Sequence, residues 1–117
     1  MSTIFDLVVG ALNSLNPPVP FAYGQLLIQD GSDFPDTFIV YIRVSASGYQ
    51  YADNEETERY YRIQVSTFSR AGVVNLPDVE SAMLAAGFVH LSTRDLPYDE
   101  ITRHYGTATD YVYYLEV

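Results

Sequence analysis

The two histidines are the side chains best suited to acid–base or metal chemistry, and one of them lies close to carboxylates. Asp99 or Glu100 could share a helical face with His104, at a spacing of four or five residues, and so offer two or three metal ligands. However, Pro97 and Gly106 bracket this segment, and no second histidine is near enough in sequence to complete a transition-metal set. The segment is therefore predicted to be a solvated loop.

The other histidine and the acidic clusters also lack the partners that chemistry requires. His90 lies in an alternating, strand-like stretch, which favours a structural or interface role over that of a catalytic base. The cluster DGSD (30–33) lacks the ligand spacing of a calcium loop, and ADNEETE (52–58) is interpreted as a solvated hairpin tip. There is neither a phosphate-binding glycine loop nor a G-x-S-x-G motif. We therefore expect no enzyme activity, no cofactor and no metal, although a small hydrolase or ligand-binding domain stays open as an alternative.

The charged residues are strongly unbalanced towards acid. Fifteen carboxylates and six basic residues, all of them arginine, leave a net charge of −9. Such a chain has no overall attraction for a phosphate backbone, which depends on clustered lysine and arginine. It also has no apolar run near the roughly 18 residues that a membrane span needs, and no cysteine for disulfides or thiolate metal sites. We expect neither specific nucleic-acid binding nor a membrane-spanning segment.

Hydrophobic periodicity predicts two helices. Apolar residues recur at three- and four-residue spacings from Ile4 to Leu15, with Ser2 or Thr3 as the expected cap and NPPVP as the stop. A second helix is expected within residues 75–87, where Asn75 could cap the start and Gly87 could end the helix.

Alternation of side-chain types predicts five strands. They are expected within residues 23–30, 37–47, 59–69, 88–95 and 109–117. Between them, residues 48–58 are expected to form a polar, acidic connection of hairpin type, and residues 96–106 a loop. The order α-β-β-β-α-β-β indicates a single α+β domain over residues 1–117, with two helices on one face of a mainly antiparallel sheet.

Two helices can cover only one face of such a sheet, and the other face carries aromatic, aliphatic and arginine side chains. Eleven tyrosines add to this pattern, and tyrosine is enriched in protein interfaces. Tyr60, Arg62 and Phe68 are therefore candidate subunit contacts, with packing beneath the first helix as the alternative. The acidic hairpin is the other candidate contact, with an ordinary surface loop as the alternative; its residues are Tyr49, Tyr51, Asp53, Glu55 and Glu56.

The carboxyl-terminal half resembles the tail terminator proteins (also called tail completion or head–tail joining proteins) of long-tailed bacteriophages. The resemblance is carried by a strand ending in IQVSTFS (63–69), a helix ending in AGF (86–88), the segment DEITRH (99–104) and the aromatic last strand (111–117). The chain length, the first helix and the acidic hairpin also fit this family. The motifs cover about half of the chain, and the order of elements covers all of it.

The resemblance implies structural work and no catalysis. Members of this family form a ring, usually of six subunits, at the head-proximal end of the tail tube. The ring stops tube polymerisation, contacts the major tail tube protein and the head connector, and lets DNA pass without binding it specifically. We accordingly expect a virion protein of the tail that is assembled in the host cytoplasm. Another neck, head-completion or tail adaptor protein is the alternative within the same class.

Overall fold

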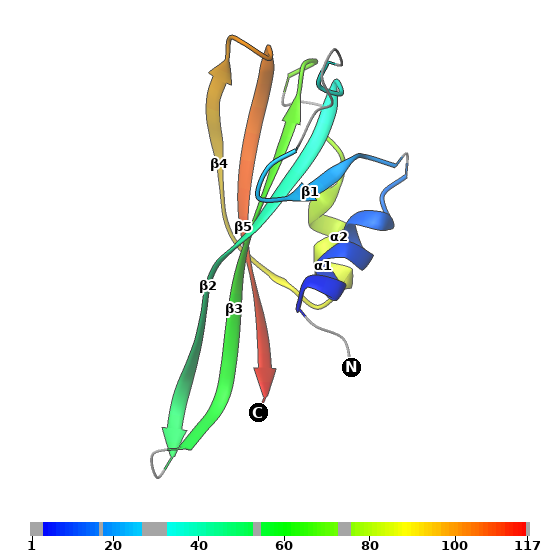
Figure 1. The fold of residues 1–117 in the computed structure, drawn as a ribbon. Helices are drawn as coiled ribbons and strands as arrows, with labels where there is room; N and C mark the ends of the chain where they lie inside the picture. The colour runs from blue at the N-terminus through cyan, green and yellow to red at the C-terminus, as the bar shows by residue number, and fades with distance from the viewer. Residues whose placement is uncertain (1–3, 17, 27–32, 53–54, 73–75, 117) are drawn as a thin grey trace.

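The computed structural model describes residues 4–16, 18–26, 33–52, 55–72 and 76–116 (Figure 1). In this part of the chain, the secondary-structure elements follow the order α-β-β-β-α-β-β, which confirms the predicted α+β class. They are α1 (Ile4–Asn13), β1 (Phe21–Tyr23), β2 (Thr37–Ala52), β3 (Glu55–Ser69), α2 (Val79–Ala85), β4 (Val89–Asp99) and β5 (His104–Glu116).

The five strands form one sheet in the order β1-β2-β3-β5-β4. The short strand β1 runs parallel to β2, and every other neighbouring pair is antiparallel. Figure 1 shows that both helices lie on the same side of this sheet, as expected, while the β2–β3 hairpin extends well past them.

Local interactions determine where α2 begins and ends. The expected caps at Ser2, Thr3 and Asn75 lie outside the described residues. For α2 the observed cap is Asp78, whose carboxylate accepts a hydrogen bond of 3.1 Å from the Ser81 amide. Gly87, at φ +101°, ends this helix in the left-handed conformation that glycine adopts without strain.

The hydrophobic core lies between the two helices and the facing side of the sheet. Its largest fully buried apolar side chains come from both helices and from β2, β3 and β5, and they are Leu12, Ile39, Ile63, Met83 and Tyr111. Full burial of one such side chain stabilises the fold by roughly 1.5–3 kcal/mol, so this layer provides the main driving force for folding.

The first predicted strand is wrong in position. It was expected within residues 23–30, whereas β1 spans Phe21–Tyr23 and pairs with residues 39–41 of β2. Residues 27–32 lie outside the described part of the chain. Pro20 immediately precedes β1, and its carbonyl accepts a hydrogen bond of 2.9 Å from the Ile39 amide. Pairing with β2 therefore begins at the proline-rich segment that ends the first helix.

Two predicted connections are wrong in extent, because strand pairing runs through most of each, although the first does join a hairpin as predicted. Residues 48–52 and 55–58 continue β2 and β3, with Gly48 opposite Arg59 and Ala52 opposite Glu55. Likewise β4 runs on to Asp99 and β5 begins at His104. In both places polar, weakly strand-forming sequence becomes strand because a neighbouring strand provides hydrogen-bond partners.

The extended pairing produces a projecting three-stranded region, which we call the arm. It consists of residues 45–52 of β2, 55–62 of β3 and 113–116 of β5. β4 does not extend into it, since its first residue, Val89, pairs with Val112. The molecule is consequently long and narrow, measuring 56 × 28 × 27 Å.

Candidate interaction surface

The side of the sheet opposite α1 and α2, which we call the open face, holds the candidate contacts from β3. Along β3, Ile63 and Val65 are buried beneath the helices. Because side chains alternate along a strand, Tyr60, Arg62 and Phe68 point to the other side. The alternative, that these three pack beneath the first helix, is therefore wrong.

An aromatic cluster occupies the open face at the end where β2 begins and β3 ends. Phe38 stacks on Phe68 with 4.9 Å between ring centroids, and the His104 ring meets Phe38 edge-on at 4.9 Å. Phe34, from the segment before β2, lies 5.6 Å from Phe38 and 6.1 Å from His104. Phe68 thus packs within its own chain, in a second small core that belongs to neither helix.

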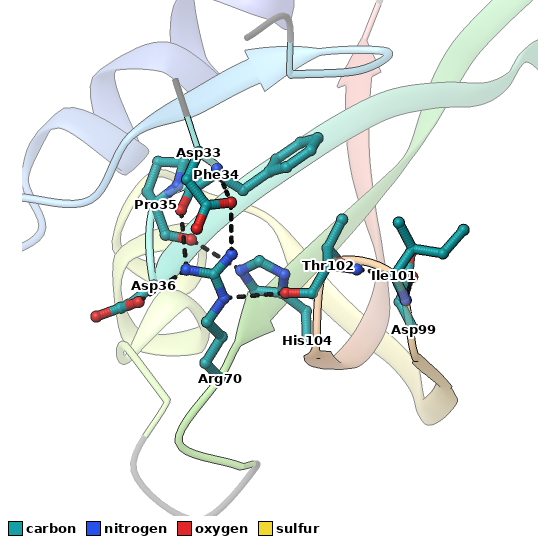
Figure 2. Close-up of polar contacts among 9 residues, drawn as sticks. All are labelled: Asp33, Phe34, Pro35, Asp36, Arg70, Asp99, Ile101, Thr102 and His104. Atoms are coloured by element: carbon teal, nitrogen blue, oxygen red, sulfur yellow. Dashed lines mark hydrogen bonds and ion pairs between the residues drawn. The ribbon is translucent and has the colours of Figure 1, made fainter. Parts of the chain in front are cut away.

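Arg70 holds this cluster in place by joining three separate segments (Figure 2). Its Nε donates to the Thr102 carbonyl at 2.9 Å, and its Nη1 donates to the Phe34 carbonyl at 3.1 Å. The same guanidinium forms ion pairs with Asp36 at 3.1 Å and with Asp33 at 2.9 Å. The hydrogen bond from Arg70 holds the pKa of Asp33 below its ordinary value. We call this set of contacts the Arg70 clamp.

The turn between β4 and β5 is ordered by its own carboxylate. Asp99 accepts hydrogen bonds from the amides of Ile101 at 2.9 Å and Thr102 at 3.2 Å. These hydrogen bonds hold the pKa of Asp99 below its ordinary value. Arg103 adopts a positive φ of 63°, which lets the chain reverse into β5. The turn leaves Ile101 94% exposed at its tip.

His104 does not lie in the solvated loop that the sequence predicts. It is 1% exposed and is the first residue of β5. Its Nε2 donates to the Pro35 carbonyl at 2.8 Å, because a carbonyl oxygen can only accept. Asp99 is its partner across the turn rather than its neighbour on a helical face. In the described residues no three His, Asp or Glu side chains are grouped to hold a metal ion.

His90 lies on β4, in the strand that the sequence predicts. Its Nε2 is 2.8 Å from the Thr93 hydroxyl and 3.7 Å from the Glu80 carboxylate. The first contact lies within β4, and the second joins β4 to the start of α2. They fit a structural role for the ring.

The centre of the open face contains a buried carboxylate. Asp110 on β5 is 3% exposed and forms an ion pair of 2.5 Å with Arg62 on the neighbouring strand. Gln64 donates to the other carboxylate oxygen at 3.3 Å. Arg62 is therefore committed to a partner in its own chain, although its side chain remains 40% exposed.

The other candidate contacts belong to the arm or to the sequence between its two longer strands. Tyr60 lies beside Tyr114, with ring centroids 6.5 Å apart, and Tyr114 is 52% exposed. The remaining candidates lie along the hairpin. Tyr49 and Tyr51 belong to β2, and Glu55 and Glu56 belong to β3, where the description covers the backbone only, while Asp53 lies outside the described residues.

Two of the hollows in the described surface lie beside features already named. One, of about 720 Å³, lies between the end of α1 and the start of α2, where Asp78 serves as the helix cap. The other, of about 460 Å³, lies on the open face beside the aromatic cluster and is lined partly by Val40, Ile42 and Ser66.

No protein-family model and no curated protein sequence match this chain. Its surface must therefore be interpreted from its own geometry. Among the described residues, neither helix has the length and apolar character needed to cross a lipid bilayer.

The two residues that organise the open face, Arg70 and Asp110, were not among the sequence-based candidates. A signal existed for Asp110, which is the only charged residue before Glu116 in the aromatic strand sequence TDYVYYLEV. For Arg70 there was none, because its partners lie 32 to 37 residues away in sequence on either side.

Proposed function

We propose that this chain is a structural assembly protein of the tail-terminator type, which forms a ring at the head-proximal end of a long phage tail. In this role it ends polymerisation of the tail tube and binds the major tail tube protein on one side. On the other side it binds the head connector, and DNA passes through the central hole of the ring. It acts in the virion, after assembly in the host cytoplasm, and performs no catalysis.

The observation that carries the proposal is the arm, which extends past the helical layer (Figure 1). A compact chain of this size would have a radius of gyration of about 13 Å, whereas the observed value is 15.9 Å. Tyr113 at the base of the arm packs against Phe88, but the backbone of the β2–β3 hairpin runs on beyond both helices (Figure 1). A projecting sheet that lies outside the helical layer contributes little to its own stability. Contact with neighbouring subunits would provide that layer.

The opposite end of the molecule offers a second, different contact surface. The β4–β5 turn exposes Ile101 at its tip, and the half-exposed rings of Tyr98 and Tyr105, which flank the turn in sequence, have centroids 4.7 Å apart. Large apolar side chains gathered on a surface mark sites of protein contact. A ring protein that joins two different partners requires two such unlike surfaces.

The charge distribution supports passage of DNA without retention. With a net charge of −9 and no lysine, the protein repels phosphate overall. Arg62 and Arg70, which could attract phosphate, are paired with carboxylates of their own chain.

Electron microscopy of the purified protein and of phage tails tests the proposal. We expect rings with a hole wide enough for duplex DNA, and antibody labelling at the head-proximal end of tails. Depleting the protein during infection should give tails of uncontrolled length without heads. Labelling on tail-free heads would instead indicate a head-completion adaptor, and absence of the protein from purified virions would exclude both assembly roles.

A further inference from the structure

The sheet has two long outer edges, and they differ in their protection against pairing with another strand. The β4 edge carries Arg94, Asp95 and Pro97 and is interrupted by two register shifts. Charges, proline and irregular pairing are the usual means by which an edge strand avoids another chain. This edge is therefore unsuited to extending the sheet.

The outer edge of β2 within the arm has none of these protections. β1 pairs with β2 only at residues 39–41, so in the described part of the chain residues 45–52 have β3 as their single neighbour. The sequence of these eight residues, SASGYQYA, contains no charge and no proline, and the only shift in pairing with β3 comes before Ser45. Such an edge is a template for another strand.

A second edge with a single paired strand lies at the same height on the other side of the arm. β4 begins opposite Val112, so in the described chain β3 is the only strand that pairs with residues 113–116 of β5, although the Phe88 ring packs against Tyr113 at 5.2 Å. The register places Ser47 opposite Tyr60 and Tyr60 opposite Tyr114. The outer edges of β2 and β5 in the arm are therefore level, with one strand between them.

The directions of the strands determine which assembly can join these edges. β2 and β5 are each antiparallel to β3 and so are parallel to one another. A subunit that turns about an axis along the arm places its β2 edge parallel to the β5 edge of the next. Repetition of this head-to-tail contact closes a ring, whereas a two-fold dimer would pair β2 with β2 in antiparallel fashion.

Charge favours the same contact. Each copy carries a net charge of −9, so two copies repel unless they meet through uncharged segments. The β5 edge ends in Glu116, which already lies opposite Glu58 of its own chain. A neighbouring β2 edge adds no further carboxylate there.

We propose that residues 45–49 of β2 in one copy pair in parallel with residues 113–116 of β5 in the next copy, so that the arms form one continuous sheet around the ring. This inference rests on the proposed ring-forming function and names the contact that closes the ring. Each contact is short, but every subunit makes two of them, and closure of the ring makes them mutually supporting.

The absence of native cysteine permits a disulfide test without background. Neighbouring strands lie about 4.8 Å apart, which falls within the Cα separations that a disulfide spans. We would compare the double variant Ser47→Cys/Tyr114→Cys with each single variant, and use Tyr49→Cys/Glu116→Cys as a second pair at another height. Oxidation would be performed on purified rings and on purified tails, after confirming that the reduced variants melt like the parent.

In either double variant we expect a ladder of covalent oligomers that ends at the ring size and collapses to monomer on reduction. The single variants should remain monomeric, since identical positions in the ring are a whole subunit apart. Efficient dimers from Ser47→Cys alone would show a two-fold β2 contact and overturn the proposal. Rings without a ladder from either pair would overturn the edge pairing while leaving the ring function standing. Absence of rings and of virion association would instead count against the function itself.

Discussion

At the scale of single residues, arginine serves as an internal connector in this protein. Arg70 joins three segments, Arg62 neutralises a buried carboxylate, and Arg43 lies over the Phe5 ring at 5.8 Å. A planar guanidinium suits all three tasks, because its fork of donors can bond several acceptors at once and its face can stack on rings. The chain thus uses its few cations mainly to hold its own segments together.

Charge reversal at Arg62 should therefore destabilise the monomer, and so would not test a subunit contact cleanly. Arg62→Glu leaves the Asp110 carboxylate, which is 3% exposed, without its cation and beside a second negative charge. We expect the free energy of unfolding to fall by at least about 2 kcal/mol. Chemical denaturation measures this change. Arg94→Glu, at an exposed position of β4, is the matched control and should change stability by less than about 0.5 kcal/mol.

Tyr111 should make the protein sensitive to alkaline pH. Burial, with a smaller effect of the Glu80 carboxylate, raises the pKa of Tyr111 to about 12. An unfolded tyrosine ionises near pH 10, whereas buried Tyr111 keeps its proton to a higher pH. The difference in protonation therefore does not reduce the stability of the folded protein below about pH 10, and it lowers that stability progressively as the pH rises towards 12. Two pKa units correspond to about 3 kcal/mol.

Denaturation of Tyr111→Phe between pH 9 and 12 should show a shallower loss of stability than in the parent protein. Tyr98→Phe is the control, because this side chain is exposed in the folded protein, and it should follow the parent. Equal slopes for all three proteins would show that burial of Tyr111 does not govern the alkaline limit.

At the scale of elements, β5 carries small residues on its open-face side, and larger side chains of neighbouring strands pack over them. Its open-face positions begin with His104 and continue through Gly106 and Ala108 to the buried Asp110. A Cβ at Gly106 would come within 2.9 Å of the Phe68 ring and 3.1 Å of Leu96. Gly106 thus makes room for the Phe68 ring of the aromatic cluster.

Gly106→Ala should accordingly destabilise the protein by about 1–3 kcal/mol, because Phe68 is stacked on Phe38 and cannot move freely. Gly10→Ala is the opposite case, since no atom lies within 4 Å of a Cβ at that position in α1. It should stabilise the protein by roughly 0.5–1 kcal/mol. Thermal denaturation of the two variants should therefore shift the midpoint in opposite directions, and a stabilising Gly106→Ala would contradict the packing described for β5.

At the scale of the whole molecule, the core and the proposed assembly contact involve largely different parts of the chain. The main core includes residues of β2 only as far as Tyr41, whereas the β2–β3 hairpin continues beyond the helices (Figure 1). In the proposed ring, this separation would let the monomer fold before it assembles. Edge strands without charge carry a risk of aggregation, which a fixed partner in a ring would remove.

Shortening the arm should separate the two processes. Replacing residues 48–59 by a two-residue Asn-Gly turn keeps the core and the open face. We expect the variant to melt within a few degrees of the parent, as monitored by circular dichroism, but to form no rings by electron microscopy. Glu55→Gln/Glu56→Gln keeps the arm at full length and is the control, in which rings should persist. Rings formed by the shortened chain would remove the arm from the assembly interface.

The sequence alone determined the α+β class and the order of elements. Periodicity within a window of ten or so residues reports the type of an element, and this information is local. It left open which side of β3 faces the helices, because both faces of that strand carry large side chains. Tertiary structure decided where the strands end, that His104 is buried, and that Arg70 and Asp110 organise the open face. Those outcomes depend on partners brought together by strand register from distant parts of the chain, and no local pattern encodes that register.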